Sequence, residues 1–202
     1  MDRISKIYYI NLDRREDRRV ETEAELRRLG LSESQWERFP AITHRCVTTG
    51  CTKSHLAVLK LARDRGHENV LILEDDFHAI VEPDEFWAEI VKFFDSKTPY
   101  DVVMLAYNLI RSEPKDDSVG YAREVQTASA YIVHNRFYDR LIDNVAEGCD
   151  LLENTGHHWN YSHDQYWKVL QPHAEWFYML KRLSVQRPSY SDLGSRYVDY
   201  KC

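Results

Sequence analysis

The stretch that most constrains the fold is the aliphatic run VLIL at residues 70–73, which ends in three consecutive acids, Glu74, Asp75 and Asp76. A strand made only of aliphatic residues is typical of the covered centre of a parallel sheet, because both of its faces are buried. In open α/β sheets, ligands collect just beyond the carboxyl ends of such strands. We therefore expect an α/β fold whose functional edge carries the three acids.

The three acids suit a divalent cation. Adjacent carboxylates repel one another unless a hard cation such as Mn²⁺ or Mg²⁺, which prefers oxygen ligands, neutralises them. Asp and Glu are also common in solvated turns and at the amino-termini of helices, so a purely structural role remains an alternative.

Composition narrows the class of protein. The chain has 202 residues, of which 43% are apolar and 12% aromatic, as expected for a single globular domain spanning residues 1–202. The formal charge of −6 argues against a nucleic-acid partner, because phosphate-binding surfaces are usually basic. No segment has the roughly 18–20 apolar residues of a membrane span, and the sequence starts without a signal-peptide layout, so we expect a cytoplasmic location.

Cysteine and histidine usage gives no clear zinc or disulfide signature. The four cysteines are Cys46, Cys51, Cys149 and Cys202. They match no zinc-ligand spacing and are too few for a disulfide scaffold, which favours a reducing compartment, although a Cys46–Cys51 bridge remains possible. The histidines at 157, 158 and 163 lack a clear fourth ligand, so a polar loop is the simpler interpretation.

Strand-like and helix-like segments alternate, a pattern that predicts a mixed, mostly parallel sheet flanked by helices. The expected strands cover residues 4–12, 36–42, 70–73, 101–105 and 127–133. The expected helices cover residues 14–29, 52–65, 84–94, 136–145 and 164–170, the first two closed by Gly30 and Gly66. We predict loops at residues 43–50 and 147–163, and a mobile loop at 110–118 that is a candidate to close over a ligand.

Five blocks in this order resemble the family 25 glycosyltransferases, which include lipooligosaccharide galactosyltransferases and the collagen hydroxylysine galactosyltransferases. The blocks are INLDRR at 10–15 with Arg18, GCTKSH at 50–55, LEDD at 73–76, TASAYIV at 127–133, and Gln186 with Ser191-Asp192. The resemblance implies a GT-A-like nucleotide-sugar-binding fold, a Mn²⁺-dependent transfer and inversion at the sugar carbon. It also implies that Asp76 is the principal metal ligand, while Glu74 or Asp75 contacts the ribose or a metal-bound water.

The remaining donor-site residues follow from the same resemblance. Asn11 and Leu12 leave the first strand at the ligand edge, and Arg14 or Arg15 could pair with phosphate through a planar fork of donors. A solvated helix start would explain the arginines equally well. Lys53, Ser54 and His55 open the second expected helix, where free N–H groups favour an anion, although Ser54 and His55 could simply cap and pack.

Residues in the second half of the chain are the candidates for binding and activating the acceptor. Asp164, in the SHDQYW segment at residues 162–167, is the candidate general base that takes the acceptor proton, with a helix cap as the alternative role. Gln165 beside it, and Ala130 in the TASAYIV block, would line the sugar and acceptor cleft. His163 could assist the metal or the diphosphate.

The sequence therefore predicts a glycosyltransferase that moves a hexose, galactose or glucose, from a UDP-sugar to a hydroxyl of a glycan or protein acceptor. Two other classes remain open. One is a nucleotide- or carbohydrate-binding module that has lost transfer activity, and the other is a metal-dependent phosphoesterase, which would also use clustered acids at a strand edge.

Overall fold

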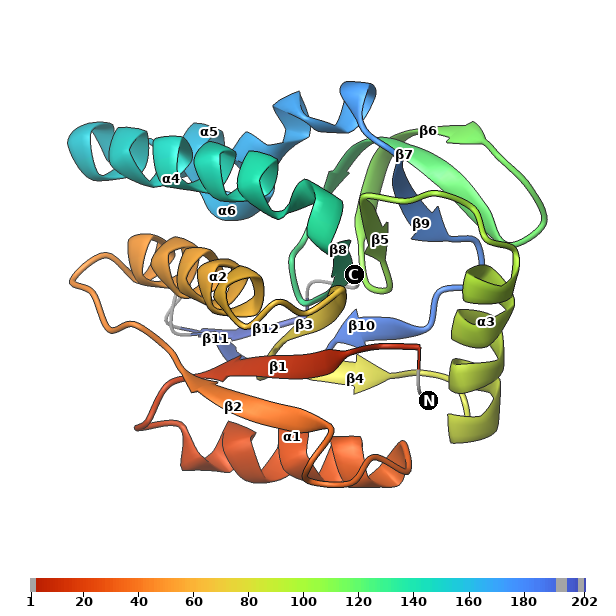
Figure 1. Ribbon diagram of the computed structural model, residues 1–202. Coiled ribbons are helices and arrows are strands. Elements are labelled where there is room, and N and C mark those ends of the chain that lie inside the picture. Colours follow the sequence, from red (N-terminus) through yellow and green to blue (C-terminus); the bar gives the residue numbers. More distant parts are fainter. Residues whose placement is uncertain (1–2, 192–195, 200–201) are drawn as a thin grey trace.

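The computed structural model describes residues 3–191, 196–199 and 202, and its centre is an eight-stranded sheet between helices (Figure 1). In spatial order the strands are β2 (Trp36–Pro40), β1 (Lys6–Asn11), β3 (Asn69–Glu74), β8 (Ala130–His134), β5 (Val102–Met104), β9 (Trp176–Met179), β7 (Val119–Gln126) and β6 (Asn108–Pro114). Two small antiparallel pairs lie outside this sheet: β4 (Phe77–Ala79) with β10 (Ser184–Gln186), and β11 (Ser189–Ser191) with β12 (Arg196–Val198).

Six of the eight strands run in one direction. The pairs β2–β1, β1–β3 and β5–β9 are parallel, whereas β8 is antiparallel to both of its neighbours, and so is β7. Only β8 and β7 therefore oppose the rest. The expected mixed, mostly parallel α/β sheet is confirmed.

Helices cover both faces of the sheet. The α-helices are α1 (Glu16–Arg28), α2 (Val47–Asp64), α3 (Pro83–Asp95), α4 (Tyr138–Thr155), α5 (His158–Tyr161) and α6 (His163–Tyr166). The 3₁₀ turns are η1 (Asn135–Phe137), η2 (Trp167–Val169) and η3 (Gln171–His173). None of the described helices has the length and apolar character to cross a bilayer.

The core has two halves, one on each face of the sheet. Leu71 and Leu73 of β3 pack with residues of α1 and α3, whereas Val70 and Ile72 pack with residues of α2 and α4. These four side chains are at most 2% exposed. Because a period-2 strand sends alternate side chains to opposite faces, burial on both faces explains why this run is wholly aliphatic.

The helix ends predicted at two glycines are confirmed. Gly30 follows α1 with a φ of +78°, and Gly66 follows α2 with a φ of +68°. Both angles lie in the left-handed region that glycine adopts without a steric penalty.

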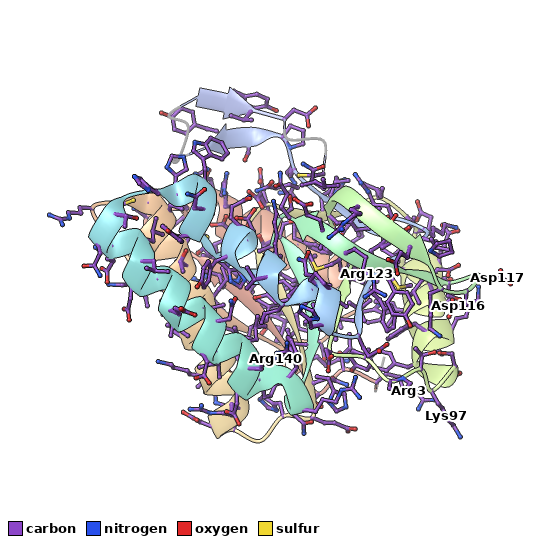
Figure 2. All side chains as sticks on the ribbon, turned by 90° about the horizontal axis from the view of Figure 1, so that it is seen from above. Arg3, Lys97, Asp116, Asp117, Arg123 and Arg140 are labelled. Atoms are coloured by element: carbon purple, nitrogen blue, oxygen red, sulfur yellow. The ribbon has the colours of Figure 1, made fainter. Side chains whose placement is uncertain are left out.

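The loop predicted at residues 110–118 is wrong, because β6 and β7 form a hairpin there. Strand β6 lies at the edge of the sheet and is almost entirely exposed, so its residues are polar and resemble a loop. The turn lies at Asp116, whose Oδ1 accepts the N–H groups of Ser118 and Val119 at 2.8 and 3.0 Å. Figure 2 shows Asp116 and Asp117 at the tip of the hairpin, directed away from the sheet.

Several predicted boundaries also differ. Helix α4 continues to Thr155, through part of the loop expected at residues 147–163, and α2 begins at Val47 rather than Thr52. Gly148 lies within α4 without interrupting it. Its lack of a side chain makes room for Tyr166, whose ring would lie 2.7 Å from a Cβ at position 148. The strand expected at 127–133 begins at Ala130, and the helix expected at 164–170 is split into α6 and η2.

Candidate functional site

The three acids lie at the carboxyl end of β3, where sequence patterning placed them. Glu74 is the last residue of β3, and Asp75 and Asp76 form the link to β4. Asp75 is 8% and Asp76 is 7% exposed. Burying two carboxylates so completely is unfavourable unless partners compensate their charges, so those partners identify what each acid can do.

Asp75 is held by β1 and α1. Asn11 donates from Nδ2 to Oδ2 of Asp75 at 2.8 Å, and Arg18 donates from Nη1 to Oδ1 at 2.6 Å. Thr22 also donates a hydrogen bond to the Asp75 carbonyl at 3.0 Å. Burial still raises the pKa of Asp75, against the opposing effect of the Arg18 charge. Both carboxylate oxygens are thus already engaged.

Only one of the two carboxylate oxygens of Asp76 has hydrogen-bond partners among the described residues. Its Oδ2 accepts a hydrogen bond from Gln186 at 3.1 Å and a longer one from Arg18 at 3.4 Å. Its Oδ1 is buried and has no hydrogen-bond partner among the described residues. Burial and the charge of Glu74 raise the pKa of Asp76 to about 7. A buried carboxylate oxygen without a donor, beside a second carboxylate, is a fitting ligand for a hard cation.

Glu74 lies next to α2. Its Oε1 contacts His55 Nε2 at 3.1 Å and accepts a weak hydrogen bond from the Cys51 thiol at 3.5 Å. Burial acts to raise the pKa of Glu74, but the interactions with His55, Cys51 and Arg18 together outweigh it, and the pKa is lowered. Glu74 is therefore the most readily ionised of the three acids.

His55 begins a buried hydrogen-bonded chain. Its Nδ1 contacts the Tyr131 hydroxyl at 2.9 Å, and that hydroxyl contacts His163 Nε2 at 3.2 Å. The two imidazoles stack with their centroids 4.4 Å apart. Burial and the nearby His55 hold the pKa of His163 well below its usual value, so His163 is neutral. Its Nδ1 has no partner among the described residues.

Asp164, in α6, is hydrogen-bonded to the turn between β7 and β8. Its Oδ2 accepts the Thr127 N–H at 3.1 Å, and its Oδ1 accepts the Ser162 hydroxyl at 3.1 Å. Thr127 has a φ of +82°, which is unusual for a β-branched residue and typical of strained functional sites. The same turn contacts the acidic segment, since the Ser129 carbonyl accepts the Glu74 N–H at 2.9 Å. Burial raises the pKa of Asp164.

Other candidate residues have mainly structural contacts. Ser54 donates to the Gly50 carbonyl at 2.7 Å and accepts the Ile42 N–H at 2.8 Å, within the start of α2. Lys53 pairs with Glu153 of α4 at 2.6 Å. Ala130 is fully buried in β8, where it pairs with Leu73.

Three of the remaining candidates lie between β1 and α1, and Gln165 lies in α6. Arg15 pairs with Asp17 at 2.8 Å and also reaches the Tyr190 carbonyl at 3.4 Å. Arg14 is exposed, and Leu12 is half-buried just after β1. Gln165 donates to Gln126 at 3.2 Å and to Asp164 at 3.4 Å.

The carboxy-terminal part of the chain completes the site. Arg18 donates to Ser189 Oγ at 2.6 Å and to the Tyr190 carbonyl at 3.0 Å, which ties the β11–β12 hairpin to the acids. The hairpin projects from the body of the molecule (Figure 2). Cys202 accepts a hydrogen bond from Thr127 Oγ1 at 3.2 Å, and its carbonyl accepts the Gln186 N–H. Asp192, part of the last sequence block, lies outside the described residues.

Sequence patterning gave Arg18 and Gln186 no role of their own, although both occur in the blocks quoted above. Arg18 lies one helical turn before Thr22 of α1, on the surface of that helix that contacts Asp75. Thr127 and Tyr131 belong to the TASAYIV block, but their residue types gave neither of them an individual role, because small and aromatic residues are ordinary in a strand. All four cysteines are free thiols, so the possible Cys46–Cys51 bridge is not formed.

Comparison with known proteins supports the fold. No protein-family model matches the sequence, and no curated protein matches it either. The structure is similar to a glycosyltransferase involved in the glycosylation of the major capsid of PBCV-1, with 13% identity and a TM-score of 0.52 over 91% of this chain and 82% of that one. A mannose-1-phosphate geranyltransferase from Thermus thermophilus gives 12% identity and a TM-score of 0.49 over 91% and 74%. The first of these two likenesses shows that the fold is similar to that of a glycosyltransferase.

Proposed function

We propose that this chain transfers a hexose from a UDP-sugar to a hydroxyl group of a glycan or protein acceptor, with inversion at the sugar carbon. The observation that carries the proposal is the buried, unpartnered Oδ1 of Asp76 among the described residues, beside Glu74 at the sheet edge where α/β folds bind ligands. The glycosyltransferase-like fold supports the same activity. Membership of family 25, a single domain for the chain and a cytoplasmic location belong to this proposal as well.

Asp76 and Glu74 are the residues that would hold Mn²⁺ or Mg²⁺. The donor set fits, because it offers carboxylate oxygens, one of which lacks a hydrogen-bond donor within the described part of the chain. When bound, the cation would neutralise the charge that develops on the diphosphate leaving group. Asp75 serves differently: its contacts with Asn11 and Arg18 fix the acidic turn in place.

The donor would lie over the carboxyl ends of β1 and β3. Asn11 ends β1 there and Leu12 follows it. Arg14 and Arg15 precede α1 close by, where a planar guanidinium can pair with a phosphate. Arg15 would exchange its contact with Asp17 for the diphosphate. On the α2 side His55 orients Glu74, whereas Lys53 and Ser54 would contribute through the electrostatics of the helix start.

Asp164 would act as the general base. A base that works near neutral pH benefits from a carboxyl group of raised pKa, and burial raises the pKa of Asp164. The Thr127 N–H and the Ser162 hydroxyl fix its two oxygens. In the transfer, Asp164 would take the proton of the acceptor hydroxyl as the acceptor oxygen attacks the sugar carbon and UDP leaves. His163 and Gln165 flank this carboxylate in sequence and would position it or the leaving group.

The test is turnover with a panel of UDP-hexoses, Mn²⁺ and hydroxyl acceptors, with separate assays for UDP, free phosphate and the glycosylated product. The proposal predicts UDP and product in equal amounts, and loss of both in Asp76→Asn. Asp117→Asn, at the tip of the β6–β7 hairpin (Figure 2), is the matched control and should retain activity. Phosphate release without a glycoside would instead indicate a phosphoesterase.

A further inference from the structure

We propose that Cys51, His55 and Glu74 form a second cation site, which binds Zn²⁺ or a similar thiophilic divalent metal. One ligand atom from each residue lies within 4.8 Å of the other two. The set contains a sulfur, an imidazole nitrogen and a carboxylate oxygen, which zinc accepts together but Mg²⁺ and Ca²⁺ do not prefer. This site does not depend on the transfer reaction proposed above.

Two of the three spacings between the ligand atoms are close to those of a tetrahedral zinc site, and the third is at most 4.8 Å. Zinc bond lengths of about 2.3 Å to sulfur and about 2.0–2.1 Å to nitrogen or oxygen place tetrahedral ligand atoms roughly 3.3–3.6 Å apart. In the structure, Cys51 Sγ lies 3.5 Å and His55 Nε2 lies 3.1 Å from Glu74 Oε1. Binding would need only small side-chain movements. Three protein ligands leave the fourth position for water or another ligand.

The three ligands lie on a long helix and a buried strand. Cys51 and His55 are four residues apart on α2, so they lie on the same face of that helix, and Glu74 ends the buried strand β3. Cys51 retains exposed surface, which gives a metal access to the site, whereas His55 is fully buried.

The hydrogen bonds behind His55 suit a metal ligand. Zinc-bound histidines usually donate their second N–H to a fixed partner, and here His55 Nδ1 meets the Tyr131 hydroxyl, which in turn meets His163 Nε2. A metal on Nε2 requires the His55 tautomer that carries its proton on Nδ1, where it would donate to the Tyr131 hydroxyl. That hydroxyl could then donate to His163 Nε2. The Cys51 proton would leave for solvent when the thiolate binds the metal.

The site also has a consequence for the acids. Glu74 would serve both the oxygen-ligand site with Asp76 and the sulfur-containing site with Cys51. A metal in the sulfur-containing site would therefore withdraw Glu74 from Asp76. The two occupancies would compete, with the thiophilic metal favoured by Cys51 and Mn²⁺ favoured by the oxygen set.

The experiment uses Co²⁺ as a spectroscopic substitute for zinc, added to the chelator-stripped, reduced protein. We expect a thiolate-to-cobalt charge-transfer band and intense tetrahedral d–d bands, which Zn²⁺ then displaces. Cys51→Ser should abolish the charge-transfer band, and Tyr131→Phe should weaken metal affinity roughly 10- to 100-fold. Cys46→Ser, just before the start of α2 and outside the ligand set, is the matched control and should keep the spectrum.

Absence of the charge-transfer band from the wild-type protein would overturn the site, and so would its persistence in Cys51→Ser. X-ray absorption of the zinc-loaded wild-type protein gives a check that needs no variant to fold. One sulfur with nitrogen and oxygen neighbours is expected, and a shell without sulfur would contradict the proposal. Neither measurement requires turnover, so a negative result is distinct from failure of the proposed transferase activity.

Discussion

Arg18 and Asp75 form an ion pair that is largely shielded from water: the Nη1–Oδ1 distance is 2.6 Å, and 12% and 10% of the two side chains are exposed. The pair joins α1 to the acidic turn after β3, and Arg18 also extends to Asp76 and to the β11–β12 hairpin. Arg18 thus fixes the position of Asp75 and Asp76 and connects them to the β11–β12 hairpin.

Arg18→Met should be strongly destabilising. Removing the guanidinium leaves Asp75 buried without its countercharge, and breaking a buried pair in this way typically costs about 3–5 kcal/mol. Chemical denaturation monitored by circular dichroism measures the free energy of unfolding. Arg19→Met, which removes a neighbouring exposed arginine paired with Glu23, is the control and should cause a much smaller loss. Equal losses in the two variants would contradict the importance given to Arg18.

Asp76 should make the metal-free protein less stable as the pH rises. Burial and Glu74 raise its folded-state pKa to about 7, from an ordinary value of 3.8. Between these values the folded state holds a proton that the unfolded chain has lost, so this contribution to stability declines from about pH 4 to pH 7. In EDTA, the melting temperature of Asp76→Asn should exceed that of the wild type by a margin that grows from pH 5 to pH 8. A constant difference between the two proteins across this range would contradict the prediction.

Asp164→Asn should reduce kcat without weakening donor binding. General-base catalysis typically contributes about 10²- to 10⁴-fold, and the amide would keep most of the local hydrogen bonds. Steady-state kinetics should therefore show a loss of that order in kcat, with the KM for the UDP-sugar nearly unchanged. Asp143→Asn, an exposed position on α4, is the control. A variant with full kcat would remove Asp164 from the mechanism.

Gly148→Ala should lower activity although alanine favours helices. A Cβ at position 148 of α4 would lie 2.7 Å from Cδ1 and 3.1 Å from Cβ of Tyr166, so Tyr166 must move. Tyr166 lies two residues after Asp164 in the same short helix, and the shift should misplace the carboxylate. Asn154→Ala, an exposed change on α4, is the control, and turnover is the measurement. Undiminished activity in Gly148→Ala would show that this packing does not position Asp164.

The acidic edge was predictable because local patterns determine it. An aliphatic run specifies a strand buried on both faces, and the parallel register that sets Ile10 opposite Glu74 brings Asn11 to the acidic turn. The same reasoning failed for β6, since an exposed edge strand carries polar residues that resemble a loop. The same reasoning also predicted too early an end for α4. Glycine is a loop signal in the sequence, whereas in the structure Gly148 makes room for Tyr166 within the helix.

The distant contacts were not predictable from local patterns. Gln186 reaches Asp76 through β10, a strand of three residues that is too short to show a periodic signal. The packing of β7, β8 and the carboxy-terminal segment brings Thr127, Tyr131 and Cys202 to the site. Their residue types are ordinary for strands and termini. The side chains that support the acids therefore depend on tertiary structure.

The most direct test is thermal stabilisation by nucleotides and nucleotide-sugars, each with and without Mn²⁺. A ligand that binds only the folded state at 100 times its Kd stabilises it by about 2.7 kcal/mol, which is readily measured as a rise in melting temperature. We predict a rise confined to UDP and UDP-sugars, dependent on Mn²⁺ and absent from Asp76→Asn. No rise with any nucleotide, under conditions in which the protein is folded, would contradict a nucleotide-sugar site at these acids.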